Sequence, residues 1–391
     1  MADSIVRFAG GGLTVSLPLS LYIHLPWCVK KCPYCDFNSH AAQGIPEAAY
    51  IDALLSDLER ALPDIWGRKI HTVFFGGGTP SLFSAAGIDR ILTGVRTLTP
   101  LLPDAEITLE ANPGTVEAAK FAGFRAAGVT RVSLGIQSFN PQHLKALGRI
   151  HDDTEARRAA ELAATHFDTF NLDLMFALPG QTLDEALADI DTALTFQPPH
   201  LSAYHLTLEP NTPFGHTAPP NLPDEDVAAD MHLAIEARLI EAGMQHYETS
   251  AYARPQHASR HNLNYWQFGD YLGIGAGAHS KLSFHDRILR QMRTKHPQQY
   301  IDAVGQGAHL ADTRTLTRND LPFEFMMNAL RLNEGVSTTL FEQRTGLPLL
   351  VCTAALERAR DRGLLERDAA RLKPTLLGQR YLNDLLELFL P

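Results

Sequence analysis

Three cysteines lie close together near the start of the sequence. Cys28, Cys32 and Cys35 have the spacing C-x3-C-x2-C in the segment HLPWCVKKCPYCDFNSH. Thiolates this close together can ligate three irons of a [4Fe-4S] cluster and leave the fourth iron open to an exchangeable small molecule. A cluster with four cysteine ligands has no such open position. The spacing therefore favours an iron-sulfur cluster that binds a ligand.

Zinc is the alternative that the cysteine spacing leaves open. In that case His24 or His40 supplies the fourth ligand. Structural zinc sites more often combine two short ligand pairs, and no second pair follows in this sequence. The fourth cysteine, Cys352, stands alone in the amphipathic segment LVCTAALERA, where we expect a buried structural thiol.

The cysteine segment begins where the first of six strand-like runs ends. These runs alternate with amphipathic helical stretches, and repeated strand-helix units predict parallel strands with right-handed crossovers. The predicted strands are residues 20–27, 70–77, 105–113, 131–139, 170–179 and 200–208. We therefore predict an α/β fold, a partial (β/α)6 barrel.

Polar and glycine residues stand at the ends of these predicted strands. In a β/α barrel the carboxyl ends of the strands form the active face, so residues there converge on one mouth. Gly76 to Gly78 permit close backbone approach to a ligand. Glu110 and Asp173 offer carboxylates, Gln137 an amide and Arg149 a guanidinium. This mixture suits a zwitterionic nucleoside, although each residue singly is as consistent with an ordinary ion pair or cap.

The cysteine loop, with Tyr34 before its last cysteine, resembles the signature of radical S-adenosylmethionine (SAM) proteins. From about Leu21 to the C-terminus, the chain is similar to the oxygen-independent coproporphyrinogen III oxidase family. The resemblance implies a [4Fe-4S] cluster on the three cysteines, with SAM chelating its open iron. It also implies that SAM is contacted by Tyr22, Gly77, Gly78, Thr79, Glu110, Gln137, Arg149 and Asp173.

Two departures separate the sequence from the oxidase itself. Phe37 stands where the oxidase motif has a further cysteine. Cys28 also comes too early for the N-terminal extension that helps to enclose the porphyrinogen in the oxidase. Both departures concern the substrate, so they argue against coproporphyrinogen III decarboxylation.

The segment SRHNLNYW, residues 259–266, is similar to the H-N-x-x-Y-W motif of the haem chaperone branch of this family. A histidine can ligate haem iron, and aromatic rings can stack on a porphyrin. The resemblance implies haem binding, with His261, Asn262, Tyr265 and Trp266 as candidates. From residue chemistry alone, a core histidine with two packing aromatics is the commoner outcome. A haem chaperone is the leading hypothesis, and a radical SAM enzyme acting on a tetrapyrrole is the alternative.

The implied partners are a haem-accepting protein and an electron donor, and a respiratory, membrane-associated protein is one candidate acceptor. A net charge of -10 argues against nucleic acid as a partner. No apolar run is long enough for a signal peptide or a membrane span. Cysteines crowded into one loop suit a reducing compartment. We therefore expect a cytoplasmic protein that is not an integral membrane protein.

The length of 391 residues predicts more than one domain. We expect an N-terminal tail at 1–19 and the barrel at 20–245. Residues 246–311 are expected to close the barrel and carry the haem motif. Residues 312–391 are expected to form a mainly helical, winged-helix-like domain.

Overall fold

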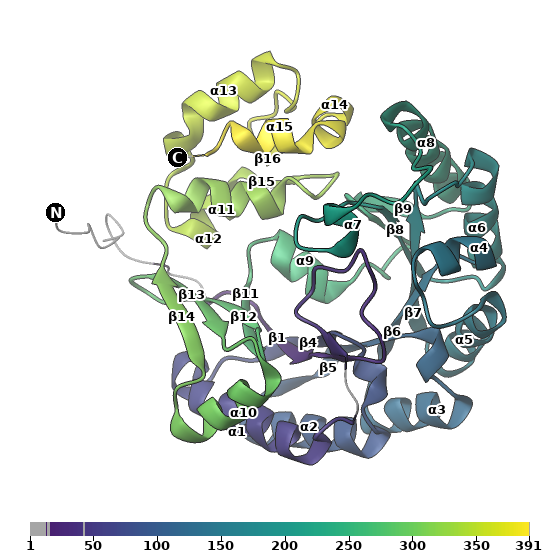
Figure 1. The fold of residues 1–391 in the computed structure, drawn as a ribbon. Coiled ribbons are helices and arrows are strands. Elements are labelled where there is room, and N and C mark those ends of the chain that lie inside the picture. Colours follow the sequence, from purple (N-terminus) through teal and green to yellow (C-terminus); the bar gives the residue numbers. More distant parts are fainter. Residues whose placement is uncertain (1–12, 14–15, 42–43, 391) are drawn as a thin grey trace.

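The computed structural model describes residues 13, 16–41 and 44–390. In this part of the chain, twelve strands form one large mixed sheet (Figure 1). Six parallel strands, neighbours in chain order, correspond to the six predicted runs and confirm the α/β class. They are β1 (Leu19–Leu25), β4 (Ile70–Gly77), β5 (Leu101–Ala111), β6 (Arg131–Gln137), β7 (Thr169–Phe176) and β8 (His200–His205).

Helices connect these parallel strands, as the amphipathic segments predict. The strands follow an arc in Figure 1, and the helices lie along its outer side. The connecting helices are α1 (Glu47–Ile65), α2 (Ala85–Leu98), α3 (Ala118–Ala127), α4 (Pro141–Ala146), α5 (Asp153–His166) and α6 (Leu183–Thr195). Two of these helices begin at a capping box, which Asp152 forms at the start of α5 and Thr182 forms at the start of α6.

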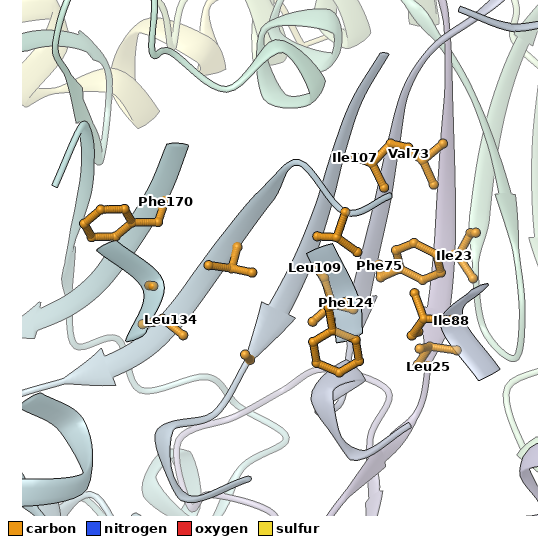
Figure 2. Close-up of a cluster of buried hydrophobic side chains, with 14 of the residues drawn as sticks. Ile23, Leu25, Val73, Phe75, Ile88, Ile107, Leu109, Phe124, Leu134 and Phe170 are labelled. Carbon is orange, nitrogen blue, oxygen red and sulfur yellow. The ribbon is translucent and has the colours of Figure 1, made fainter. Parts of the chain in front are cut away.

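The outer face of the sheet is apolar and packs against the helices. Figure 2 shows Val73 and Phe75 of β4 beside Ile107 and Leu109 of β5, with Ile88 of α2 against them. All five side chains are buried in the main hydrophobic core. Burial of this face supplies most of the driving force that orders the sheet.

The inner face of the same strands is polar. In β1, Ser20 and Tyr22 alternate with the core residues Leu19 and Leu21. Because successive side chains of a strand point to opposite faces, the polar members of each strand share the inner face. The inner residues of the next strands are Thr72, Phe74, Glu106, Thr108, Glu110, Arg131, Ser133, Asn171, Asp173, His200, Ser202 and Tyr204. Parallel sheets are usually apolar on both faces, so a polar inner face indicates a ligand site.

Six further strands extend both edges of the sheet. On one side β11 (Asp270–Ile274) pairs in parallel with β1, and antiparallel β12 (His279–Ser283), β13 (Ile288–Arg293) and β14 (Leu310–Thr315) follow. On the other side lie β10 (Ala251–Ala253) and β9 (Gln245–Glu248). The segment between β10 and β11 carries α9 (Arg260–Trp266). The connection from β8 to β9 contains α7 (Pro213–His216) and α8 (Glu225–Glu241), and the connection from β13 to β14 contains α10 (Pro297–Gln306). The region after the sixth predicted strand is therefore integral to the sheet.

The C-terminal residues form a second hydrophobic core, which also includes Phe268 and Ile288 from the region of the large sheet. Phe325 and Phe341 pack edge to face within it, and Cys352 is buried there, as expected for a structural thiol. The elements are α11 (Asp320–Ala329), α12 (Thr338–Thr345), α13 (Thr353–Asp361), α14 (Leu376–Arg380), α15 (Leu382–Glu387) and the antiparallel pair β15 (Val336–Ser337) and β16 (Arg371–Leu372).

The predicted domain boundaries remain a proposal, with two structural observations beside them. The N-terminal tail at 1–19 lies mostly outside the described residues, and its last residue, Leu19, already belongs to β1. The boundary between 311 and 312 falls inside β14. Within the described residues, no helix is long and apolar enough to cross a membrane.

Candidate functional site

The cysteine loop is tied together at its two ends. The short strands β2 (Trp27–Cys28) and β3 (His40–Ala41) pair in parallel. The His24 Nε2 donates to the Asn38 carbonyl at 2.9 Å, so its Nδ1 accepts from the Tyr22 hydroxyl at 3.0 Å. Burial lowers the pKa of His24 to about 4, which keeps the ring neutral. His24 therefore stabilises the loop through hydrogen bonds of both ring nitrogens rather than binding a metal.

The three thiols suit a cluster better than a single zinc ion. Cys28, Cys32 and Cys35 are free and partly buried. Across the described ranges, no three His, Cys, Asp or Glu side chains converge as a single-ion site. Ligands of a cubane bind three different irons and need not converge on one point. The second zinc candidate, His40, has its Nε2 3.3 Å from the Asn38 side-chain oxygen.

A glycine turn between β11 and β12 contacts both ends of the cysteine loop. A Cβ at Gly275, where φ is +103°, would lie 2.5 Å from the His24 carbonyl oxygen. That position therefore requires glycine. The Asn38 amide donates to the Ala276 carbonyl at 3.0 Å. The Tyr50 hydroxyl donates to the His24 carbonyl at 2.9 Å and accepts from the Ala276 N–H at 2.8 Å.

The glycine turn is held in turn by Asp57, a fully buried residue of α1 that the sequence analysis missed. Its Oδ2 accepts from the Gly275 N–H at 3.3 Å and from the Tyr300 hydroxyl at 2.8 Å. Burial alone would raise the pKa of Asp57, but Arg293 and His309, at 3.3 and 3.1 Å, hold it below its ordinary value. The carboxylate is therefore charged and paired.

The predicted glycine motif lies against the first strand of the cysteine loop. A Cβ at Gly77, where φ is +114°, would lie 2.5 Å from the His24 ring. A Cβ at Gly78 would lie 2.5 Å from the Trp27 carbonyl oxygen, and the Thr79 N–H donates to that same oxygen at 2.7 Å. The Gly77 N–H donates to the Glu110 carboxylate at 3.3 Å. These predicted residues therefore lie together.

Arg149 brings the other side of the predicted site to the cysteines. Its guanidinium lies 3.6 Å from the Cys32 sulfur and donates to the Gly135 carbonyl at 2.7 Å. Gln137 ends β6 with φ of +68°, a conformation that non-glycine residues seldom adopt. A Cβ at Gly135 would meet both the Gln137 amide and the Arg149 guanidinium. The two predicted side chains therefore lie side by side.

Glu110 and Asp173 form a pair of partly buried carboxyl groups below this mouth. Burial raises the pKa of Glu110 to about 8, and the nearby Asp173 contributes to the shift. Burial also raises the pKa of Asp173, although Ser133 and Asn171 donate to its carboxylate at 2.8 and 2.7 Å. A cationic ligand placed beside this pair would favour the charged forms.

The raised pKa of Glu110 predicts a pH-dependent stability of the ligand-free protein. Glu110 ionises near the ordinary pKa of 4.5 in the unfolded chain but only near pH 8 in the folded one. The free energy of unfolding is therefore unaffected by this group below about pH 4.5, and it falls as the pH rises from 4.5 towards 8. We expect Glu110→Gln to stabilise the protein by about 1–3 kcal/mol at pH 8 and to have little effect at pH 5. Denaturant unfolding at both pH values, with exposed Glu59→Gln as control, measures this. A difference that is the same at both pH values would contradict it.

The H-N-x-x-Y-W segment forms α9, whose histidine points into the floor of the sheet. The His261 side chain is 1% exposed, and its Nδ1 lies 2.8 Å from the Thr72 hydroxyl. Thr72 donates its own proton to Ser20, so His261 Nδ1 is the donor and its Nε2 accepts from the Tyr265 hydroxyl at 3.0 Å. Burial lowers the pKa of His261 to about 3. The Nε2 lone pair of His261, which would bind haem iron, therefore already accepts a hydrogen bond from the Tyr265 hydroxyl.

The other haem candidates do not face one common site. Tyr265 packs on His261 and Tyr271, with ring centroids 4.8 and 4.5 Å apart. Trp266 instead lies against the C-terminal core, with the Arg331 guanidinium 4.4 Å from its ring centroid. Asn262 is partly exposed. In this structure the segment joins the barrel floor to the C-terminal domain.

This geometry predicts that His261→Ala affects stability more than haem occupancy. The change removes two buried hydrogen bonds and leaves a cavity, which we expect to cost about 2–4 kcal/mol. The matched control, His216→Ala, changes an exposed histidine and should cost little. Thermal unfolding and haem titration of both variants are the measurements. Unchanged stability together with loss of the Soret band would instead identify His261 as the ligand.

Comparison with known proteins bears on the fold and on the family. The Radical SAM superfamily model matches residues 22–193, and the HemN C-terminal domain model matches residues 316–381. The chain has the fold of the solved Escherichia coli coproporphyrinogen III oxidase (HemN), with a TM-score of 0.82 and 25% identity over 96% of this chain and 90% of that one. Fold and cysteine loop define a radical SAM protein, as the resemblance predicted.

Full-length relatives identify the branch. The haem chaperone HemW of Escherichia coli (strain K12) is 51% identical over 95% of this chain and 98% of its own length. HemW of Bacillus subtilis (strain 168) is 33% identical over 95% of this chain and 99% of its own. A mouse relative, radical S-adenosyl methionine domain-containing protein 1, mitochondrial, is 34% identical over 97% of this chain and 88% of its own. The chain belongs to the HemW family.

Proposed function

We propose that this protein binds haem and transfers it to an acceptor protein, and that its cysteine loop holds a [4Fe-4S] cluster with SAM at the open iron. One observation carries the haem proposal: the match to proteins named haem chaperone runs over almost the full chain. An intact mouth of strand-end residues beside the cysteines supports the SAM proposal.

The cysteine loop fits a cluster because the thiols that would bind iron are not the groups that hold the loop in place. Cys28, Cys32 and Cys35 would ligate three irons, while His24 and Asn38 fix the two ends of the loop. The Arg149 guanidinium beside Cys32 would stabilise its thiolate. A reduced cluster of this class supplies the electron that cleaves SAM.

The eight predicted SAM residues supply complementary groups around the open side of the loop. Glu110 and Asp173 would accept from ammonium or ribose hydroxyls, and burial raises the pKa of both carboxyl groups, that of Asp173 despite the nearby charge of Arg131. The glycine motif would let the backbone approach the ligand closely. Arg149 and Gln137 would bind polar groups at the opposite side of the mouth. The set we propose is Tyr22, Gly77, Gly78, Thr79, Glu110, Gln137, Arg149 and Asp173.

The oxidase alternative is weakened by the position of Phe37. This residue replaces the further cysteine of the oxidase motif, and its side chain is 61% exposed directly after the cysteine loop. An exposed aromatic ring there suits contact with a flat ligand or a partner better than redox chemistry. We propose a cytoplasmic location, an electron donor and a haem acceptor that can be membrane-associated.

Haem binding and coproporphyrinogen III turnover should be assayed side by side on the anaerobically reconstituted protein. We expect about four irons and four sulfides per chain, about one haem per chain, and no decarboxylation with SAM and reductant present. Cys32→Ala should lose the cluster, and the control Cys352→Ala should keep it because Cys352 lies in the C-terminal core.

Two results would contradict the proposal. Protoporphyrinogen formation by the wild-type protein would restore the oxidase hypothesis. A protein that bound its cluster and SAM but no haem would refute the chaperone hypothesis.

A further inference from the structure

Arg131 is a buried cation without a partner on the inner face of the sheet. It is the first residue of β6 and only 3% exposed. Val132 and Leu134 point into the outer core, so Arg131 and Ser133 point to the inner face. Within the described residues, the guanidinium makes no hydrogen bond or ion pair, and its Nε is fully buried and unbonded.

Two histidines near Arg131 are neutral. His200 bonds Asn171 at 2.7 Å and the Tyr247 hydroxyl at 2.9 Å, and His261 bonds Thr72 and Tyr265. Burial lowers the pKa of both histidines, and the charge of Arg131 lowers it further. Neither histidine therefore adds or balances charge at neutral pH.

The carboxylates on this face are engaged elsewhere. Glu106 accepts from the backbone N–H groups of Arg260 and His261 at 3.1 and 3.0 Å, at the start of α9. Asp173 accepts from Ser133 and Asn171; the charge of Arg131 lowers the pKa of this carboxyl group, but burial outweighs that effect and the pKa stays raised. Neither forms an ion pair with Arg131 in the part of the chain that the structure describes.

A buried arginine in this state requires an anion. A guanidinium does not lose its proton in proteins, and buried charges are otherwise paired and hydrogen-bonded. Thr108 is the register partner of Arg131 on β5, and its buried hydroxyl is also unbonded. A guanidinium fork beside one free hydroxyl matches the two oxygens of a carboxylate.

Solvent reaches the inner face above Arg131. Tyr204 of β8 lies on this face and is 41% exposed, and Glu110 and Asp173 are partly exposed. A ligand that enters at the mouth therefore meets polar groups of the inner face.

We propose that Arg131, together with Thr108, binds a carboxylate of the ligand inside the barrel. Resting on the proposed function, this assignment takes the carboxylate from haem, as a propionate, because the methionyl carboxylate of SAM is assigned to the open iron of the cluster. Arg131 is in this account a ligand-binding residue at the inner end of the site.

Arg131→Gln, titrated with haem and with haem dimethyl ester, tests the assignment. We expect the variant to bind haem about tenfold or more weakly, and haem dimethyl ester within about twofold of wild type. SAM, titrated alongside, should bind the variant as it binds the wild-type protein.

Three controls keep the outcome interpretable. Arg131→Lys retains the charge and should lose less affinity, and it replaces the glutamine variant if that one does not fold. Arg125→Gln removes a partly exposed arginine paired with Asp168 and should change neither ligand. Iron content and thermal unfolding verify that each variant keeps its cluster and fold.

Equal losses for haem and haem dimethyl ester, or no loss for either, would overturn the assignment. Stabilisation of wild type but not Arg131→Gln by chloride, with no effect on haem or its dimethyl ester, would show an inorganic anion site and also overturn it. A wild-type protein that bound no haem would refute the proposed function itself.

Discussion

The buried carboxylate of Asp57 is the interaction on which the cysteine loop depends. Burying a charge is costly, and Asp57 is stabilised only because Arg293, His309, Tyr300 and the Gly275 N–H all point at it. Removing one partner of such a group costs about 3–5 kcal/mol, so the arrangement has no easy alternative. It fixes the glycine turn, and the turn fixes both ends of the loop through His24 and Asn38.

The second organising feature is the division of the sheet into an apolar outer face and a polar inner face. Core residues such as Phe75 pack on helices, while Glu110 and Asp173 on the same sheet face the ligand side. The apolar face stabilises the sheet without using the inner one. The inner face can therefore carry carboxyl groups with raised pKa values and an unpaired Arg131, which a structural core would not tolerate.

Local patterns predicted the six parallel strands and the cysteine loop well. Strand runs such as 70–77 have the expected β-branched and aromatic residues, and the glycine motif and Glu110 meet because parallel strands end at one edge. Asp57 was not predictable in this way. A single aspartate in an amphipathic helix looks like a solvent-facing residue, and its partners are more than two hundred positions away in sequence.

The haem motif shows the same limit. Sequence gives the types and order of His261, Tyr265 and Trp266, but not which way each side chain points. In the structure the histidine seals the barrel floor and the tryptophan packs towards Arg331. The family resemblance implied a ligand and its stacking faces, whereas residue chemistry alone favoured a packed core histidine; in the structure, register and burial place His261 and Trp266 in packing contacts.

Coordination of SAM to the reduced cluster tests the central claim of this account most directly. Electron-nuclear double resonance on the wild-type protein, with SAM labelled with 15N at its amino group and 17O at its carboxylate, reports whether those atoms touch iron. The account predicts hyperfine coupling to both labels, because three cysteines leave one iron open. A cluster signal with no coupling to either label would show that the fourth iron is closed, and would contradict the assignment of this site.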